Sequence, residues 1–583
     1  MRSHLSLLLK KLLKNKRETE ETIVIKGQDL KPRDISIMCD QLTEVTVDDL
    51  MKLPAPFDKP EMEPGFKAPK PDWNEKYNSH LDGFIAIDTF ERPKTKEEEE
   101  ELVQKFLRGV ERMLSTDTNG GILQALNLSM EYCAKCNTCS NACHIFEATN
   151  GNEIYRPTYR AEVLRMIVKK YFDKNGKLIP GGKKGVMVKF IGGDIDLNWQ
   201  TVARLGELAY RCNLCRRCAQ TCPLALDNGL LAREIRKIFS QEMGIAPKPL
   251  HEKGTQLQLK TGSSTGMSKV PFLDTVEFLD EDATDLFGEG TTEYKTPIDV
   301  EGADILLIHN AGEFNAWPEN PMAFTMLFQE AGLSWTLSSD IGGYDNVNYG
   351  LFYDDLQAKK VALKQNEVAK KLGVKRIVIA ECGHAHKAAA ITADRFYPGS
   401  DRVPVQSFLP LMRDLVLSGT FNIDPNRNDF PVILHDPCNI VRQMGVVKPQ
   451  RDILKAIMKP GHYGNMGLPY YEMKEHGVNN YCCGGGSGFA IMNSMSFPAW
   501  RDNVAHRKKL AQILEAFGPE LMENTDVPKY ICAPCSNCKG AMRDIIEHYE
   551  LDRFNVHYGG LVELIVNAMT KYSTPYMEFL RDE

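Results

Sequence analysis

The chain has 583 residues, of which 43% are apolar and 26% are charged, and its formal net charge is −7. This length predicts several domains, and the composition is that of a globular protein rather than a disordered or fibrous one. The negative charge gives no indication of nucleic-acid binding, and no apolar run is long enough to cross a bilayer.

The first residues, MRSHLSLLLKKLLKNKR, predict an amphipathic helix. The leucines at 5, 8, 9, 12 and 13 share one helical face, and the lysines at 10, 11 and 14 share the other. This pattern suits a helix that lies on a membrane surface or against a partner, and a frayed basic terminus is the alternative. The apolar stretch is too short for a secretion signal and lacks a cleavage site.

Residues 1–119 form an N-terminal extension without a cysteine cluster. Its proline-rich stretch KLPAPFDKPEMEPGFKAPKPDW predicts an extended strap across another surface. A helix is expected to begin near Thr95, because Thr95 and Glu98 form a plausible capping box. Its apolar stripe comprises Leu102, Phe106, Val110 and Met113.

Residues 120–245 carry two runs of the form C-x-x-C-x-x-C-x-x-x-C, the second followed by proline. Bacterial two-cluster ferredoxins have this spacing, and the fourth cysteine of each run ligates the other cluster. The sequence therefore predicts a mostly helical domain with two cubane [4Fe-4S] clusters. The expected ligands are Cys133, Cys136, Cys139 and Cys222 for cluster one, and Cys212, Cys215, Cys218 and Cys143 for cluster two.

Zinc is the alternative metal, but four-thiolate zinc sites usually use two separated cysteine pairs, which fits two complete runs poorly. His144 follows Cys143 in place of the usual proline, so the local turn is less certain. The 68 residues between the runs exceed the span of a minimal ferredoxin, and we expect inserted helices there.

Residues 246–300 are rich in charge, contain GSSTG and are predicted to be a linker. Beyond them, short apolar runs alternate with helical patterns, which predicts α/β domains over 301–425 and 426–583. The expected strands are ADILLIHNA, RIVIAE, FPVILHD and KYICA. The first two resemble the last two, with RIVIAECGHAHK matching KYICAPCSNCK. We interpret the region as a duplication, with chance similarity as the alternative.

The stretch YCCGGGSG at 481–488 places two cysteines before three glycines. Neighbouring side chains diverge, so the pair suits different irons of one cluster better than a single metal ion. Glycines permit positive φ and let N–H groups approach inorganic sulfide. Further cysteines at 438, 532, 535 and 538 favour a cluster over a strained vicinal disulfide, a zinc site using Cys535 and Cys538, or a simple turn.

The pattern Cys438…Cys482-Cys483-Gly484…Cys535-x-x-Cys538 resembles the CCG domain of heterodisulfide reductases. This resemblance covers roughly residues 120–570 and implies one noncubane [4Fe-4S] cluster as the catalytic site. Its implied ligands are Cys438, Cys482, Cys483, Cys535 and Cys538. Cys532 is then an extra thiol, although a pairing of Cys532 with Cys535 stays open.

The layout is similar to that of D-type heterodisulfide reductase subunits and of the DsrK family, whose members belong to the DsrMKJOP membrane complex of dissimilatory sulfite reduction. The first repeat favours the DsrK family. Gly312 stands near the expected first cysteine, Gly342 and Gly343 replace the cysteine pair, and Cys382 alone survives.

This resemblance implies a peripheral oxidoreductase subunit on the cytoplasmic face of the cytoplasmic membrane. It would reduce a disulfide or trisulfide on the sulfur carrier DsrC. Electrons would come from menaquinol through a DsrM-like cytochrome b subunit of the complex. Cleaving an S–S bond takes two electrons, and cubane clusters deliver them singly. No dinucleotide fingerprint is present, so we expect no flavin or nicotinamide.

His384 and His435 are predicted proton donors for the released thiols, and His386 and Lys387 are further candidates. Each could instead be a structural hydrogen-bonding residue. Cys382 is either a vestige packed in a core or a group beside the cluster.

Two other functions compete with disulfide reduction. One is a pure electron-transfer subunit of a heterodisulfide reductase or of a flavin-dependent glycolate, lactate or glycerol-3-phosphate dehydrogenase. The other is a structural zinc scaffold. The unpaired first repeat and the N-terminal extension argue against the electron-transfer alternative.

Overall fold

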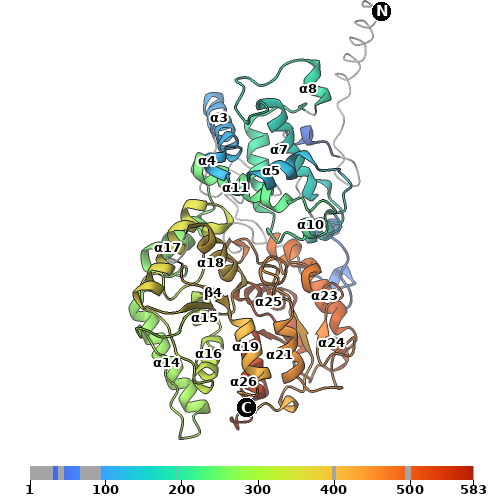
Figure 1. Cartoon of the computed structure of the whole chain (residues 1–583). Helices are drawn as coiled ribbons and strands as arrows, with labels where there is room; N and C mark the ends of the chain where they lie inside the picture. Colours follow the sequence, from blue (N-terminus) through green and yellow to red (C-terminus); the bar gives the residue numbers. More distant parts are fainter. Residues whose placement is uncertain are drawn as a thin grey trace, which may run out of the picture.

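The computed structural model describes residues 30–36, 45–65, 93–191, 193–396, 402–492 and 500–581. The predicted N-terminal amphipathic helix and Cys39 lie outside these residues. Figure 1 shows a helical domain above two α/β repeats that lie side by side. None of the described helices combines the length and the apolar character needed to cross a membrane.

The helical domain is built mainly from five helices. They are α3 (Lys96–Met113), α5 (Leu123–Glu131), α7 (Pro157–Tyr171), α9 (Trp199–Tyr210) and α11 (Asn228–Met243). The Thr95 hydroxyl accepts a hydrogen bond from the Glu98 backbone N–H, so α3 begins at the predicted cap. Phe106, Val110 and Met113 of its stripe are buried.

Shorter helices complete this domain, namely α4 (Thr116–Asn119), α6 (His144–Ala148), α8 (Val186–Phe190) and α10 (Arg217–Gln220). Helices α6 to α9 occupy the segment between the two cysteine runs, where inserted helices were expected.

Each repeat contains a four-stranded parallel sheet, with strand order β2-β1-β3-β4 in the first and β6-β5-β7-β8 in the second. The strands are β1 (Ile305–Ile308), β2 (Trp335–Thr336), β3 (Arg376–Ile379), β4 (Val405–Ser407), β5 (Val432–Leu434), β6 (Tyr471–Glu472), β7 (Lys529–Cys532) and β8 (Val556–Gly559). The four predicted strands are confirmed as the central pairs β1, β3, β5 and β7. Central parallel strands are buried on both faces and read as apolar runs, unlike the short edge strands.

The backbone after the equivalent strands β3 and β7 turns in the same way. The Cys382 N–H donates to the Ala380 carbonyl at 2.6 Å, and the Cys535 N–H donates to the Ala533 carbonyl at 2.6 Å. A 14-residue helix follows each turn, α18 (Gly383–Phe396) and α25 (Ser536–Tyr549). These shared features support the duplication inferred from the sequence.

One hydrophobic core lies between the two sheets. Ile305 and Leu307 of β1 and Val432 and Leu434 of β5 face it, whereas the alternate residues face the outer cores, as the two-residue period of a strand requires. Helices α16 (Glu319–Glu330), α19 (Phe408–Leu417), α21 (Pro449–Ile457) and α26 (Leu561–Ala568) contribute to this central core. Helices α17 (Asp355–Lys371) and α23 (Arg507–Phe517) contribute to the outer cores of the first and second repeats.

The stretch 246–300 is not the expected linker. It contains α12 (Lys248–Leu250), a π-helical turn (His251–Gln256), α13 (Leu257–Thr261) and α14 (Lys269–Phe287). Helix α14 buries Phe272, Val276 and Leu279 against the first repeat. The abundant charged residues of α14 obscured this apolar stripe in the sequence.

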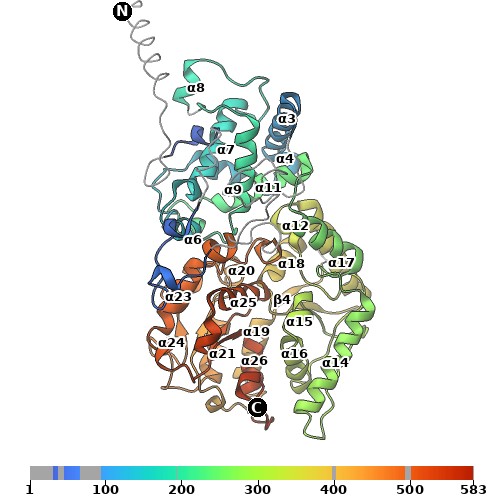
Figure 2. The same cartoon turned by 180° about the vertical axis from the view of Figure 1, so that it is seen from behind.

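The described part of the proline-rich strap, residues 52–65, contains turns and a short 3-10 helix (Pro60–Met62) and lies against the second repeat, and Met51 directly precedes it. The Met51 N–H donates to the Ala148 carbonyl of the helical domain, and Arg507 of the second repeat donates to the Met51 carbonyl. Phe57 is buried, with its ring 5.4 Å from that of Tyr549. Figure 2 shows this blue segment beside α23. This part of the chain, from Met51 through the described residues of the strap, therefore links the helical domain to the second repeat.

Candidate iron–sulfur centres

The predicted ligands of cluster one lie together near the surface of the helical domain. The pKa of the Cys139 thiol is raised to about 11, mainly by burial and also by the nearby Cys133, Cys222 and Cys136 thiols. Cys136 is exposed and Cys133 is half-buried. The fourth cysteine of the second run therefore reaches the first run, as the crossed assignment requires, at a place open to an external electron donor.

The predicted ligands of cluster two form a deeper group. Cys143, Cys212, Cys215 and Cys218 line one cavity together with Arg160. Burial raises the pKa of the Cys143 thiol to about 12, with smaller contributions from Cys215 and Cys212.

Arg160 supports the presence of an anion in this cavity. Its side chain is 4% exposed, it has no carboxylate partner among the described residues, and its Nε has no hydrogen-bond partner. The guanidinium interacts electrostatically with the Cys212, Cys143 and Cys218 thiols. A buried cation without a counter-ion is costly, and an iron–sulfur cluster held by four thiolates is anionic. The residues present thus fit a [4Fe-4S] cluster.

The five cysteines of the CCG pattern meet in the second repeat. Cys438 begins α20 (Cys438–Val441) after β5, Cys535 and Cys538 open α25, and the pair Cys482 and Cys483 precedes α22 (Phe489–Met492). The Cys482 thiol interacts with that of Cys438, and the Cys483 Sγ lies 3.4 Å from the Cys538 Sγ. The Cys535 thiol interacts with that of Cys538. Adjacent thiols thus reach different partners, as expected for one cluster with several irons.

The glycines after the pair are required by close packing. Gly484 has φ of +93°, and its N–H donates to the Cys482 Sγ at 3.4 Å. A Cβ atom at Gly484 would lie 2.4 Å from the His506 ring, and one at Gly485 would lie 2.7 Å from the Asn537 carbonyl oxygen. The loop therefore has no room for side chains at these two positions.

The second cubane group touches the double-cysteine loop directly. The Cys215 thiol interacts with that of Cys482. Asn213 donates from Nδ2 to the Gly484 carbonyl at 2.7 Å, and its Oδ1 lies 2.8 Å from Nε2 of His144. The residue that replaces the usual proline is therefore one end of a buried bridge between the two sites.

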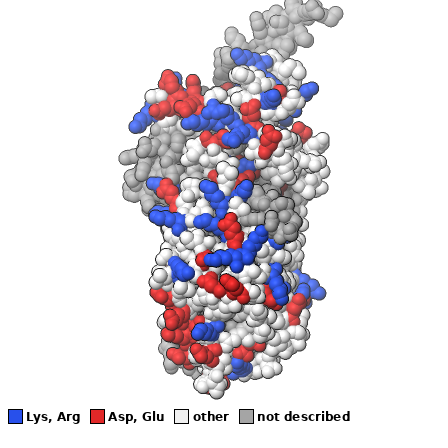
Figure 3. Space-filling model, turned by 60° about the vertical axis from the view of Figure 1, so that its left-hand side comes forward, with Lys and Arg blue, Asp and Glu red and all other residues white. Residues whose placement is uncertain are grey.

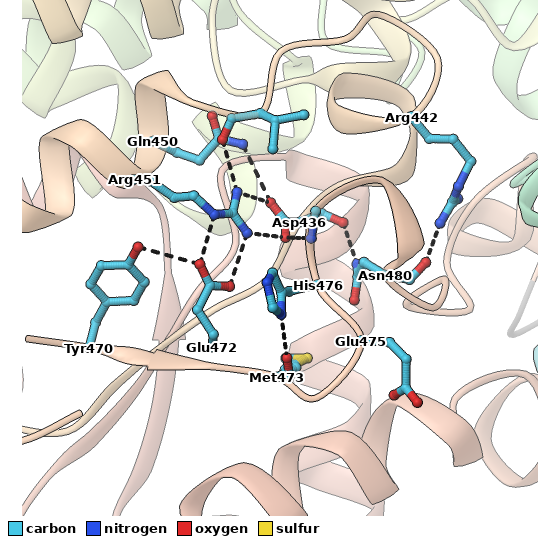
Figure 4. Close-up of polar contacts among 12 residues, drawn as sticks. Asp436, Arg442, Gln450, Arg451, Tyr470, Glu472, Met473, Glu475, His476 and Asn480 are labelled. Atoms are coloured by element: carbon cyan, nitrogen blue, oxygen red, sulfur yellow. Dashed lines mark hydrogen bonds and ion pairs between the residues drawn. The ribbon is translucent and has the colours of Figure 1, made fainter. Parts of the chain in front are cut away.

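A buried ion-pair network connects the segment before Cys438 to the segment before Cys482 (Figure 4). Arg451 donates to Asp436 at 2.9 and 2.6 Å and to Glu472 at 2.7 and 2.9 Å. Asp436 also accepts from the Gly477 N–H, while the Asn480 side chain donates to the Asp436 carbonyl. This network fixes the turn before Cys438 relative to the turn before Cys482.

Of the predicted proton donors, the structure brings His435 to the thiols. A ring nitrogen of His435 and the Sγ atoms of Cys483 and Cys538 lie within 4.8 Å of one another, and burial lowers the pKa of His435. His384 instead hydrogen-bonds to the Asn348 carbonyl at 2.8 Å, and burial lowers its pKa to about 4. His386 is also buried, with a pKa lowered to about 4.

The two extra cysteines occupy different environments. Cys532 lies in β7 and packs into the central core between the sheets, so a pairing with Cys535 is not supported. The Cys382 thiol, from the first repeat, interacts with that of Cys535. Cys382 therefore lies beside the five-thiol group rather than in an unrelated core.

Two buried residues near the thiols were missed by sequence analysis, Lys509 and His506. Lys509 donates to Asn480 at 2.8 Å and to Gln512 at 2.6 Å, and burial lowers its pKa to about 8 although the Cys483 thiol opposes this effect. His506 packs over Gly484. Neither belongs to a local motif, because α23 reaches the site only through the tertiary fold.

Comparisons with known proteins agree with this arrangement. Residues 129–226 match the 4Fe-4S dicluster domain family. The chain is 24% identical to Hdr-like menaquinol oxidoreductase iron-sulfur subunit 2 of Archaeoglobus fulgidus, over 76% of this chain and 80% of the relative. It is 22% identical to a subunit of the dihydromethanophenazine:CoB–CoM heterodisulfide reductase of Methanosarcina barkeri, over 65% of this chain and 83% of the relative. A probable membrane-anchored ferredoxin of Chromohalobacter salexigens is 21% identical, over 72% of this chain and 59% of the relative.

No solved structure matches the chain. The similarities support a [4Fe-4S]-binding oxidoreductase that resembles heterodisulfide reductases.

Proposed function

We propose that the chain is the catalytic iron–sulfur subunit of a membrane-bound complex that reduces a disulfide or trisulfide with electrons from menaquinol. The observation that supports this proposal most is the direct contact of Cys215 with Cys482. It joins an electron-carrying group to a buried site with five thiols, which is more than a cubane cluster needs.

The proposed electron path runs from the exposed group around Cys136 to the group around Cys215 and then to Cys482. Menaquinol supplies two electrons and two protons, and one disulfide takes up both to give two thiols. A trisulfide takes up the four electrons and four protons of two menaquinols, and it gives two thiols and one hydrogen sulfide. A noncubane cluster bound by the five cysteines would supply electron storage next to the substrate sulfur. We propose His435 as the group that moves a proton there, on its proximity to Cys483 and Cys538.

Within this proposal the chain acts as a DsrK-type subunit, with DsrC as the sulfur carrier and a DsrM-like cytochrome b as the electron donor at the cytoplasmic face. The absence of a second five-cysteine set supports this choice over a heterodisulfide reductase with two such clusters. In the first repeat, Gly312, Gly342 and Gly343 stand where cysteines would be needed.

Electron paramagnetic resonance (EPR) of the anaerobically purified chain tests the proposal. Oxidised protein is mixed with reduced DsrC, and a new substrate-dependent cluster signal is expected. The signal should be absent in Cys483→Ser and in a DsrC variant without its cysteines. No new signal, together with tight binding of a flavoprotein dehydrogenase, would instead support the electron-transfer alternative.

A further inference from the structure

A cleft opens where the helical domain meets the first repeat. Its volume is about 90 Å³. Its apolar lining comprises Ile122, Leu214, Leu230, Leu351, Phe352 and Ile391, and its charged lining includes Arg216, Arg233, Asp355 and Lys387. Leu214 precedes Cys215, so the inner wall of the cleft adjoins the junction between the second cubane group and the double-cysteine loop.

Lys387 connects this cleft to the five-thiol group. It lies on α18, one turn after Gly383, where a Cβ atom would be 2.6 Å from the Ile440 side chain. Such tight packing sets α18 against α20, the helix that begins at Cys438. The Lys387 ammonium accordingly interacts electrostatically with the Cys438 thiol.

Lys387 differs from the other cations of the cleft because it forms no ion pair among the described residues, although Cys438 and Asp227 act on it electrostatically. Arg216 pairs with Asp227, and Arg233 pairs with Asp355 and Glu234. Lys387 has no ion pair or hydrogen bond within the described ranges, and burial lowers its pKa to about 7. An ammonium that makes no direct ion pair in a partly buried cleft favours binding of an anion.

The dimensions of the site restrict what can reach it. The five thiols are at most 6% exposed, so the surface of a folded partner cannot touch them. A substrate sulfur has to arrive on a narrow group. Figure 3 shows that Lys and Arg side chains predominate across the middle of this face of the molecule, which favours an approaching anion.

We propose that this cleft admits the substrate sulfur and that Lys387 binds an anionic group carried next to that sulfur. The ligand class is a slim disulfide or thiol with a carboxylate, from either a peptide arm or a small molecule. This inference rests on the proposed function. It adds the route by which the substrate reaches the five thiols and names Lys387 as the residue that selects the substrate.

Anaerobic calorimetry on the full cluster-loaded chain tests the route. The first probe is a ten-residue Gly/Ser peptide with one cysteine beside a free C-terminal carboxylate, and the second is the same peptide with an amidated end. Dithiodiglycolate represents the small-molecule source. We expect the carboxylate peptide or dithiodiglycolate to bind at least tenfold more tightly than the amide peptide. Tighter binding of the carboxylate peptide would identify a peptide arm as the source, and tighter binding of dithiodiglycolate would identify a small molecule.

Lys387→Met and Lys387→Glu should no longer bind the carboxylate probes more tightly than the amide peptide, whereas Lys387→Arg should keep this preference. Lys375→Glu is the matched control, because Lys375 is exposed and precedes β3 at the opposite end of the strand from the thiols. Equal binding by wild type and Lys387→Glu would overturn the inference. If reduced DsrC still changes the EPR spectrum in that case, the access route fails and the proposed function stands. Absence of any spectral response would refute the function itself.

Discussion

Position 312 in the first repeat and position 438 in the second follow equivalent strands at the same distance. Ile308 pairs with Ile379 in one sheet, Leu434 pairs with Cys532 in the other, and four residues later the chain has Gly312 or Cys438. The histidines after these strands also correspond. His309 packs against Phe314 and Phe324, whereas His435 faces the thiols. Equivalent backbones therefore carry different chemistry.

In the first repeat, other buried side chains occupy the space that the thiols occupy in the second. Tyr344 follows Gly343, is buried, and stacks on Phe272 of α14 at 4.6 Å. Asp345 is fully buried and accepts hydrogen bonds from the backbone N–H groups of Ser264 and Val347. The segment 246–300 thus closes the first site with well-bonded protein. Loss of the cysteines was accompanied by a repacked interior.

The largest expected difference is between serine substitutions at two equivalent cysteines, Cys535 of the second repeat and Cys382 of the first. Cys535→Ser should remove the noncubane cluster and about a third of the iron, because the cluster loses one of its five cysteine ligands. Cys382→Ser should keep the full iron content and change only the EPR line shape. Iron analysis of both purified variants makes the comparison. Equal iron loss in the two would show that the first repeat still supplies a ligand.

A cysteine introduced into the first repeat should destabilise it rather than restore a site. In Gly343→Cys the new Cβ atom would lie 2.6 Å from the Ser338 Cβ and 3.0 Å from Val368. We expect a loss of about 1–3 kcal/mol in the free energy of unfolding. Gly312→Cys is the control, since its nearest neighbour is 3.1 Å away. Denaturant unfolding measures both, and extra iron in Gly343→Cys would contradict the repacked-interior account.

Asn213→Ala tests the buried bridge between the helical domain and the double-cysteine loop of the second repeat. Loss of its bonds to the Gly484 carbonyl and to His144 should cost about 1–3 kcal/mol and slow electron transfer between the second cubane cluster and the noncubane site. Asn198→Ala is the control. It removes the N-terminal cap of α9 with a similar loss of folding stability and leaves the double-cysteine loop unchanged. Pulse-reduction kinetics should be slower only in Asn213→Ala.

The smallest effect concerns the charge beside cluster two. Arg160→Gln should lower the reduction potential of that cluster, since the lost positive charge stabilised its more negative reduced form by on the order of 1 kcal/mol. Arg160→Lys keeps the charge and should retain most of the potential. An EPR-monitored redox titration gives both values. Identical shifts in the two variants would assign Arg160 a packing role instead.

Much of this architecture could be predicted because its signals are local. The cysteine spacings, the cap at Thr95 and the central strands are all contained in short segments. Two edge strands, β2 and β6, were missed because two residues carry too little pattern, and the other two, VQS and VHYG, because polar residues interrupt them. Helix α14 was missed because its charges hide a narrow apolar stripe. Arg160, Lys509 and the Asn213 bridge depend on contacts between segments distant in the sequence, which no local pattern encodes.

The central claim is that the second repeat alone holds a third cluster, of a different kind from the two cubanes. Iron and sulfide analysis combined with Mössbauer spectroscopy of the anaerobically purified chain tests it most directly. The account predicts about twelve irons per chain, with a third of the spectrum distinct from cubane [4Fe-4S] centres. About eight irons and a purely cubane spectrum would contradict it.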